Sequence, residues 1–510
     1  MAPRRRQGSH LITNNRHMPF QFENSYAGLP SEFYSLVAPT PVTEPSLIRV
    51  NRELTELLGV DVATLQSPAG LGILAGNQIC AGSIPLAMAY AGHQFGGFSP
   101  QLGDGRAVLL GEVVGTDGVR YDVQLKGSGP TRFSRRGDGR SALGPVLREY
   151  IVSEAMATLG VPTTRALAAV STGENVLREG MIAGGILTRV AKSFVRVGTF
   201  QWFAARGDFE NLKVLADYVI DRHYLEAKES KTPYRVLLDS VIERQAILVA
   251  HWMQLGFIHG VMNTDNTAVS GETIDYGPCA FMDTYESNKT FSSIDHQGRY
   301  GFGNQGPMAH WNLSRFAETL VPLLASDSDQ GVAIAEEALD RFVEIYEREL
   351  QQRFKAKIGL GVDADDLANA DDVDWELVRE LLTLMEDGKA DFTLVFRQLS
   401  LVLESNRDDK VLALFDCTKG IAAWLKVWRA RVVEVDGGAA VALMHRSNPI
   451  FIPRNHRIEE VIEAGYSGDF ELFHRLRDVL QHPFDEQPKN AVYEDAPTDD
   501  EIVPATFCGT

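Results

Sequence analysis

The chain has 510 residues, enough for one large domain with extensions or for two to three domains. Hydrophobic residues (44%) and charged residues (23%) are balanced as in an ordinary globular protein, which excludes a disordered or fibrous class. The net charge of -19 would repel the phosphate backbone of DNA or RNA, so we expect no nucleic acid as the main partner.

The first residues are basic. Four arginines precede the first acid, Glu23, which is similar to a mitochondrial transit peptide, whereas Pro3 and the missing amphipathic pattern favour an unstructured leader. We assign 1–24 to a flexible leader and leave a targeting signal open. The four cysteines are widely spaced without a CxxC pair, which favours a reducing compartment. We expect a cytoplasmic protein, or a mitochondrial one if the source is eukaryotic.

An N-terminal extension, 25–95, precedes the first strong strand signals. Apolar spacing predicts helices from Ser46 to Gly59 and from Ser83 to Ala91, separated by a stretch rich in Pro and Gly. The extension has no motif of its own that indicates chemistry.

Region 96–211 is predicted to be rich in strands. Ala107–Val114 and Val119–Leu125 are β-prone and flank the turn signal Gly115-Thr-Asp-Gly118, which predicts an antiparallel hairpin ending at Lys126. A Gly- and Arg-rich loop follows, and then a helix over Ser141–Leu159 with Ser141 as its cap.

Two more strands are expected at Arg165–Ser171 and Met181–Arg189, joined through Gly173-Glu-Asn175. From Leu212 onward helical periodicity dominates. The predicted helices are Pro233–Leu255, Trp311–Leu324, Gly331–Lys357, Trp375–Glu386 and Ile458–Leu480.

One segment of this helical part differs: Ile258–Met282 has short apolar runs that predict a β-hairpin framing a polar loop. Ala246–Met262, the most apolar stretch, is interrupted by polar residues, so no transmembrane helix and no membrane partner are expected. We assign 212–330 to a core with a metal site, 331–482 to a helical C-terminal extension and 483–510 to a flexible acidic tail.

The order of these parts indicates an ATP site. Gly103 and Gly105 open the hairpin, where missing side chains let backbone amides approach a triphosphate. Lys126 ends the second strand, and Glu149 on the next helix could orient its ammonium group. This layout is that of protein kinases, so we predict an α+β fold with a bilobal, protein-kinase-like arrangement. Taken alone, the glycines could form a plain turn and Lys126 could lie on the surface.

A polar loop supplies candidate metal ligands. Asn266 and Asp275 stand on the two arms of the predicted short hairpin and carry the oxygens that Mg²⁺ prefers. Asp265, beside Asn266, is free to act as a general base on a protein hydroxyl. The structural alternative is a pair of Asx turns.

A set of arginines could hold phosphate oxygens, because the guanidinium group makes forked contacts with them. Surface ion pairing is the alternative for any single member. The set comprises Arg132, Arg135, Arg136, Arg140, Arg189 and Arg196.

Several runs resemble the selenoprotein O family of pseudokinases, over about Phe20 to Leu480. They are Tyr90-Ala-Gly-His-Gln-Phe-Gly96, Pro100-Gln-Leu-Gly-Asp-Gly-Arg-Ala107, Gln124-Leu-Lys-Gly-Ser-Gly-Pro-Thr131, Ser134-Arg-Arg-Gly-Asp-Gly-Arg140, His259-Gly-Val-Met-Asn-Thr-Asp-Asn266, Asp275-Tyr-Gly-Pro278, Asn448-Pro449 and Arg454-Asn455.

The resemblance implies an enzyme that binds ATP end for end relative to ordinary kinases and transfers AMP to protein hydroxyls of Ser, Thr or Tyr. It implies an ion pair between Lys126 and Glu149, Mg²⁺ or Mn²⁺ on Asn266 and Asp275, and Asp265 as proton acceptor. The residues implied to contact the nucleotide are Gly103, Gly105, Arg106, Lys126, Asp138, Gly139, Arg189, Arg196 and Asp275.

The residues support part of this expectation independently. His259-Gly260-Val261 has no acid in the third position, where an ordinary kinase carries its base, so standard transfer of the γ-phosphate would lack that base. One departure concerns the C-terminus: where some family members have selenocysteine, this chain has Cys508, whose possible thiol partner is Cys279 and whose alternative is to stay unpaired. The rival functions are an atypical kinase and a catalytically silent nucleotide-binding redox scaffold. We expect a monomer with protein substrates.

Overall fold

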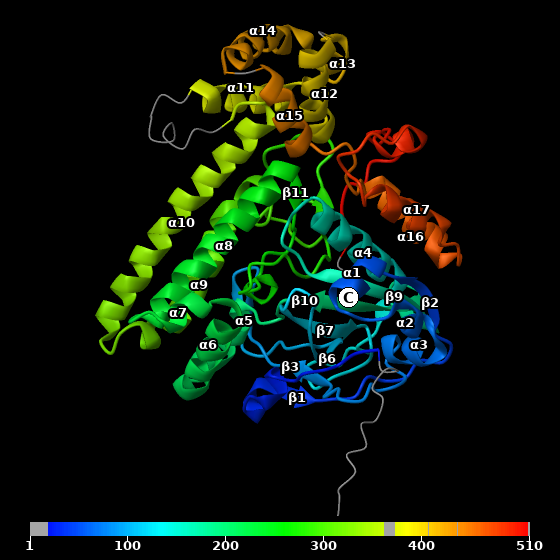
Figure 1. The fold of residues 1–510 in the computed structure, drawn as a ribbon, viewed down its shortest axis with the longest axis vertical. Helices are drawn as coiled ribbons and strands as arrows, with labels where there is room; N and C mark the ends of the chain where they lie inside the picture. The colour runs from blue at the N-terminus through cyan, green and yellow to red at the C-terminus, as the bar shows by residue number, and fades with distance from the viewer. Residues whose placement is uncertain (1–18, 362–372, 406, 436, 508–510) are drawn as a thin grey trace, which may run out of the picture.

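A computed structural model describes residues 19–361, 373–405, 407–435 and 437–507. Most of the predicted leader and Cys508 lie outside these ranges. The described chain is α+β, as predicted. An antiparallel sheet fills one side of the molecule and long helices fill the other (Figure 1). No helix of the described residues is both long and apolar enough to cross a membrane.

The sheet has eight strands in the order β1-β3-β6-β7-β10-β9-β2, with β8 paired to β10 off this path. Its strands are β1 (Tyr34–Leu36), β2 (Ser46–Val50), β3 (Leu86–Met88), β6 (Ala107–Val114), β7 (Arg120–Lys126), β8 (Ser141–Ala142), β9 (Arg165–Leu177) and β10 (Met181–Ala191). All pairings are antiparallel, and Lys126 lies opposite Leu187 of β10 and Ala107 of β6. The predicted hairpin is confirmed to within one residue.

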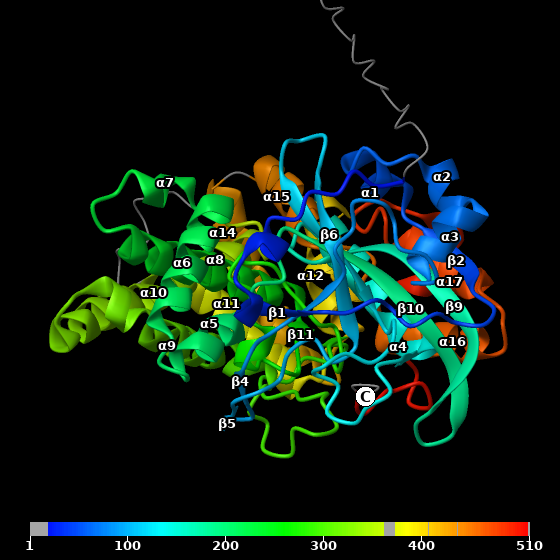
Figure 2. The same cartoon turned by 90° about the horizontal axis from the view of Figure 1, so that it is seen from below.

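Helices cover the sheet and continue beyond it (Figures 1 and 2). The N-terminal ones are α1 (Arg52–Leu57), α2 (Val62–Gln66), α3 (Pro68–Leu74) and α4 (Leu143–Thr158). The next are α5 (Val197–Ala204), α6 (Phe209–His223), α7 (Leu225–Lys228), α8 (Pro233–Leu255), α9 (Gln305–Leu324) and α10 (Ser328–Lys357). The last are α11 (Val373–Asp387), α12 (Phe392–Ser405), α13 (Asp409–Leu412), α14 (Thr418–Val435), α15 (Gly437–Ser447), α16 (Asn455–Tyr466) and α17 (Glu471–Val479).

In helix α8, residues at each end determine where the helix begins and ends. Pro233 occupies its first turn, where a missing N–H costs nothing, and Gly256 ends it with φ of +69°. The following residues form β11 (Phe257–Ile258), which pairs with β12 (Ala280–Phe281). The predicted hairpin around the polar loop is therefore confirmed.

The two helices expected in the N-terminal extension are wrong in part. Ser46–Val50 is strand β2, and helix α1 starts only after Asn51, whose side chain accepts a hydrogen bond from the Leu54 N–H. Leu86–Met88 is strand β3, paired with β1 and β6. Periodicity cannot separate short buried strands from helices, and pairing with distant strands decides the outcome.

Three other boundaries differ from the prediction. Ser141 does not cap α4, because Ser141 and Ala142 pair with β10. Gly173 to Asn175 continue β9, and the turn lies at Arg178–Gly180, where the Arg178 N–H donates to the Gly180 carbonyl. The last predicted helix is two helices, α16 and α17, interrupted near Gly468, whose φ is +82°.

The segment expected to be a flexible tail packs on the protein up to residue 507. Tyr493 is buried, and the Thr506 hydroxyl donates to the Pro278 carbonyl at 2.6 Å. Thr506 also pairs with Ser292 in a parallel bridge. The end of the described chain thus lies against the segment that follows Asp275-Tyr276-Gly277.

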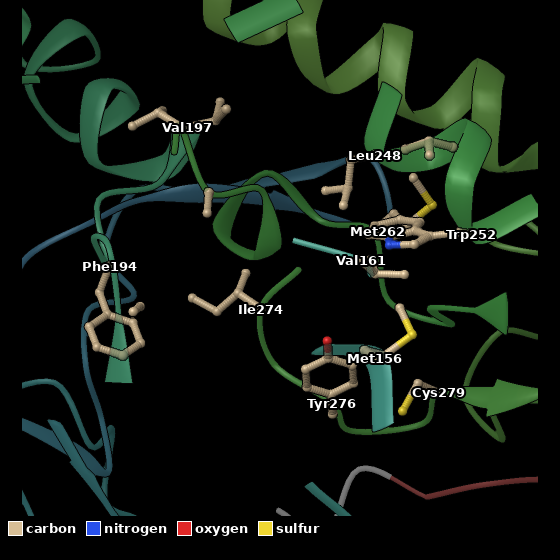
Figure 3. Close-up of a cluster of buried hydrophobic side chains, with 14 of the residues drawn as sticks. Met156, Val161, Phe194, Val197, Leu248, Trp252, Met262, Ile274, Tyr276 and Cys279 are labelled. Carbon is tan, nitrogen blue, oxygen red and sulfur yellow. The ribbon is translucent and has the colours of Figure 1, made fainter. Parts of the chain in front are cut away.

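An apolar cluster behind the polar loop holds that loop in place (Figure 3). It combines side chains from α4, α8 and the loop itself, among them Met156, Leu248, Trp252, Met262 and Tyr276. Complete burial of one such side chain is worth about 1.5–3 kcal/mol. The Trp252 indole N–H also donates to the Thr273 hydroxyl, so packing and hydrogen bonding both fix the backbone just before Asp275.

Lys357 at the end of α10 is an unusual buried cation. It is 2% exposed, and its ammonium group lies 4.3 Å and 5.1 Å from the ring centroids of Phe396 and Phe392. Burial lowers its pKa from 10.5 to about 7. The folded protein therefore disfavours the charged form.

Replacing Lys357 with methionine should raise the free energy of unfolding at pH 6 by roughly 1–3 kcal/mol. Between pH 7 and 10.5 the unfolded chain binds the proton more readily, so the unfolding free energy of the native protein rises with pH and the advantage of the variant shrinks. Urea unfolding at pH 6 and pH 9 measures both. An advantage that grows with pH would contradict the assignment.

Candidate active site

A cavity of about 820 Å³ opens between the sheet and the helices. It brings together residues that lie far apart in the sequence and includes all but one of the predicted site residues. Those on its wall are Gly103, Gly105, Arg106, Lys126, Asp138, Gly139, Arg189, Arg196, Asp265, Asn266 and Asp275. Glu149 on α4 is buried behind Lys126 and does not line the cavity.

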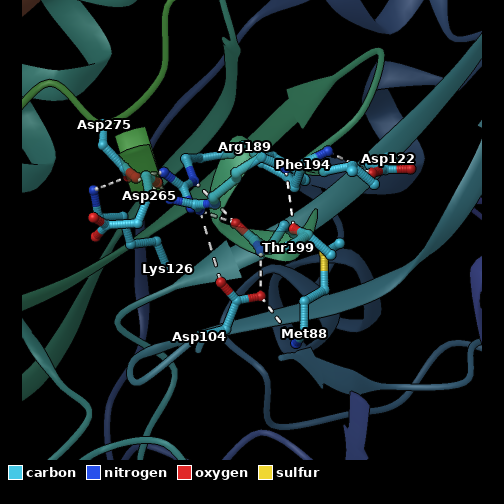
Figure 4. A network of polar contacts seen from close by, with 12 residues as sticks. Met88, Asp104, Asp122, Lys126, Arg189, Phe194, Thr199, Asp265 and Asp275 are labelled. Atoms are coloured by element: carbon cyan, nitrogen blue, oxygen red, sulfur yellow. Dashed lines mark hydrogen bonds and ion pairs between the residues drawn. The ribbon is translucent and has the colours of Figure 1, made fainter. Parts of the chain in front are cut away.

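Asp275 is the common partner of three cations (Figure 4). Its Oδ1 accepts from Arg189 at 2.6 Å and from Lys126 at 3.3 Å, and its Oδ2 accepts from Arg196 at 2.6 Å. Burial would raise the pKa of Asp275, but the charges of Arg196, Lys126 and Arg189 outweigh it and hold the pKa well below 3.8. Asp275 therefore stays ionised.

Lys126 and Arg189 share a second carboxylate. Lys126 Nζ donates to Glu149 Oε2 at 2.5 Å, and Arg189 lies 3.3 Å from the other oxygen of Glu149. Three cations thus face two carboxylates at the inner end of the cavity. The N–H groups of these cations suit the oxygens of a phosphate group.

Asp104 and Gln124 contact the side chains of Arg196 and Arg189. Asp104 Oδ1 lies 3.8 Å from Arg196, and its Oδ2 accepts from the Gln124 amide at 3.1 Å. The side-chain oxygen of Gln124, Oε1, in turn accepts from Arg189 Nε at 3.1 Å. Both residues are buried and were missed by the sequence analysis, although Asp104 stands between the two predicted glycines.

Asp265 lies in a short 3-10 helix, Thr264–Asn266. Burial raises its pKa to about 6, against the opposing charge of Arg196. Its Oδ2 accepts from the Gln94 amide at 3.1 Å, and its Oδ1 is buried without a hydrogen-bond partner among the described residues. Asp265 lines the cavity, and a carboxylate in this position can accept a proton from a bound hydroxyl. The contribution of Gln94 was also missed, although the run that contains it was singled out.

Asn266 carries the amide oxygen that is predicted to bind the metal ion. Its Nδ2 donates to the Val261 carbonyl at 2.9 Å, which leaves the amide oxygen as the acceptor on the cavity side. An amide oxygen and the Asp275 carboxylate form a hard-oxygen donor pair, which fits Mg²⁺ when phosphate oxygens and water complete the shell. The residues present therefore fit the predicted ion.

At two positions that line the cavity, close contacts leave room only for glycine. A Cβ on Gly103, whose φ is +79°, would lie 2.3 Å from the Phe133 ring. A Cβ on Gly139, whose φ is +66°, would lie 2.2 Å from the Gly129 backbone. Next to Gly139, Asp138 accepts from Arg178 at 2.9 Å, a hydrogen bond that lowers the pKa of Asp138. Both glycines allow the loops to approach each other closely.

The predicted arginine set does not act as one group. Arg189, Arg196, Arg135 and Arg140 line the main cavity. Arg140 is tied to the Thr40 and Pro41 carbonyls, and Arg132 lines a separate cavity of about 350 Å³. Of the predicted set, only Arg189 and Arg196 meet Lys126 at Asp275.

Known proteins resemble this chain over nearly its whole length. The family model described as "Protein adenylyltransferase SelO" matches residues 16–481. A "Protein nucleotidyltransferase YdiU" of Rhodopseudomonas palustris (strain BisB5) is 56% identical over 495 residues, which cover 96% of this chain and 99% of that protein. Proteins of the same name from Nitrobacter hamburgensis and Rhizobium etli are each 54% identical, covering 98% of this chain and 98% and 100% of theirs.

Proposed function

Because this chain belongs to the SelO family of protein adenylyltransferases, a family of nucleotidyltransferases, we propose that it transfers AMP from ATP to Ser, Thr or Tyr hydroxyls of acceptor proteins. One observation supports this most directly. Lys126 and the buried Arg189 and Arg196 converge on Asp275 in a cavity that Asp265 also lines. A triphosphate and a proton acceptor can therefore be accommodated side by side.

The proposed arrangement is that of a protein kinase. Strands β6 to β10 and α4, within 96–211, would form one lobe, and 212–330 the core of the other. The extensions would be 25–95, which adds β1, β2 and β3 to the sheet, and 331–482. Its support is the order of parts: a Gly-rich hairpin, Lys126 on β7, Glu149 on α4, and then the loop with Asp265, Asn266 and Asp275. Nucleotide sites often lie where two such parts meet.

The residues have separate tasks in the proposed reaction. Arg189, Arg196 and Lys126 would hold the terminal phosphates at the inner end, with the α-phosphorus toward the cavity mouth. Asn266 and Asp275 would hold Mg²⁺ or Mn²⁺, whose charge would offset the negative charge that develops on the phosphate oxygens.

Asp265 would act on the acceptor. The acceptor hydroxyl oxygen forms a bond to the α-phosphorus while Asp265 takes its proton, and the bond from the α-phosphorus to the bridging oxygen breaks. Pyrophosphate leaves with that electron pair. Gly103, Gly105, Arg106, Asp138 and Gly139 would contact the remainder of the nucleotide.

ATP labelled separately at the α- and γ-phosphates tests the proposed function. The purified protein with Mg²⁺ or Mn²⁺ and a bacterial lysate should place the α label on proteins and release the γ label in pyrophosphate. Transfer of the γ label would indicate a kinase. Transfer of neither label, with ATP still bound, would indicate a silent scaffold.

A further inference from the structure

A small hairpin forms the wall of the cavity beside Asp265. Strands β4 (Gly92–Gln94) and β5 (Gly97–Ser99) pair only with each other among the described strands, and they lie near the lower edge of the molecule in Figure 2. The His93 N–H donates to the Thr264 hydroxyl at 2.7 Å, and the Gln94 amide donates to Asp265. The hairpin and the loop that carries the base are therefore linked directly.

The tip of this hairpin holds an aromatic ring in a strained backbone. Phe95 has φ of +51° and is followed by Gly96 with φ of +84°. A non-glycine residue in this region costs about 1–2 kcal/mol. The Phe95 N–H donates to Asn263 Oδ1 and to the Tyr300 hydroxyl, each at 3.1 Å, so the surrounding structure enforces the conformation.

The Phe95 ring belongs to none of the buried apolar clusters of the described residues. It packs on Tyr300 with ring centroids 5.1 Å apart, lines the cavity and remains 38% exposed. Ile294, from the segment after β12, lines the same cavity and is 53% exposed. Leu177, which is 68% exposed, also lines this cavity. Single exposed apolar side chains are ordinary, but three along one charged cavity offer a surface that phosphate oxygens do not need.

We propose that Phe95, together with Ile294, anchors the acceptor protein through an apolar side chain one or two residues from the modified hydroxyl. This inference rests on the proposed function, because the acceptor hydroxyl must reach Asp265 and its chain must then pass over the hairpin. An extended chain advances about 3.3 Å per residue, so neighbours of the modified residue meet the adjacent wall. Rigid aromatic side chains in partly formed pockets are the usual anchors of protein contacts.

Phe95→Gly is the decisive variant, because glycine adopts φ of +51° without strain, which offsets the packing on Tyr300 that is lost with the ring. Phe209→Ala is the matched control: Phe209 is 50% exposed at the start of α6 and does not line the cavity. The probes are synthetic peptides with one Ser, Thr or Tyr, flanked by either leucine or glycine, and ATP labelled at the α-phosphate.

The unaltered protein should label leucine-flanked peptides with a kcat/KM at least tenfold above that for glycine-flanked peptides. Phe95→Gly should remove this preference and lower the labelling of lysate proteins. Its Kd for ATP should stay within twofold of that of the unaltered protein, and its melting temperature within 2 °C. Phe209→Ala should change none of these.

Three results would overturn the inference. The first is a leucine preference that survives in Phe95→Gly. The second is a loss of ATP affinity in that variant, which would assign the ring to the nucleotide. The third is a native protein that labels lysate proteins but does not favour leucine-flanked peptides. If the native protein transfers no α label to any protein, the proposed function itself fails, which is a distinguishable result.

Discussion

Asp275→Ala is expected to lower AMP transfer by at least about a thousandfold, the scale seen when a charge-stabilising group of an active site is lost. The carboxylate is both a proposed metal ligand and the shared partner of Lys126, Arg189 and Arg196. Without it, Lys126 and Arg189 are left with Glu149, and Arg196 is left with Asp104 at 3.8 Å. The measurement is the rate of α-label transfer at saturating ATP and metal.

The same substitution should destabilise the protein when no nucleotide is bound. Removing one partner of a buried ion pair costs about 3–5 kcal/mol, since the remaining charges stay buried. Adding pyrophosphate should recover part of the lost melting temperature in Asp275→Ala, because its negative charge can take the place of the carboxylate.

Asp275→Asn serves as the control that keeps the shape and removes the charge. It should be as inactive as the alanine variant. A variant at this position that folds and retains more than a tenth of the activity would contradict the metal assignment.

The sequence predicts secondary structure best where the preferences of neighbouring residues determine it. The Gly115 to Gly118 turn separates two β-prone runs, so β6 and β7 follow from short-range preferences and place Lys126 at the end of its strand. In α8, Pro233 and Gly256 mark both ends of a helix whose bounds match the prediction. The convergence of Lys126, Asp265 and Asp275 on one cavity needed more than local signals; the order of motifs indicated it.

Contacts between segments that lie far apart in the sequence could not be predicted from it. Gln94 is 171 residues from Asp265, and nothing near either residue indicates that an amide donates to that carboxylate. Asp104 looked like part of a plain glycine turn, yet it is buried under Arg196. Strand β2 was read as helix because its partner, β9, starts more than a hundred residues later. Each error concerns a residue whose environment is supplied by a distant segment.

Arg454→Met is expected to destabilise the protein by about 3–5 kcal/mol, the usual cost of breaking a buried ion pair from one side. Arg454, before α16, is 1% exposed and donates to Asp283 at 2.6 Å and to Asp391 at 2.8 Å. Burial opposes its charge, but the two carboxylates outweigh it and keep the pKa of Arg454 raised. Urea unfolding near pH 7 measures the loss.

Arg454→Met leaves two carboxylates buried without their partner. Replacing these carboxylates as well should therefore restore part of the lost stability. Asp283 follows β12 and Asp391 precedes α12, and Arg454 also donates to the Glu494 carbonyl, so one guanidinium group joins four segments. In a triple variant with Arg454→Met, Asp283→Asn and Asp391→Asn, no unpaired charge remains and at least about half of the lost stability should return. Equal stability losses in the single and triple variants would show that Arg454 acts through packing and its backbone contact, and would refute the electrostatic account.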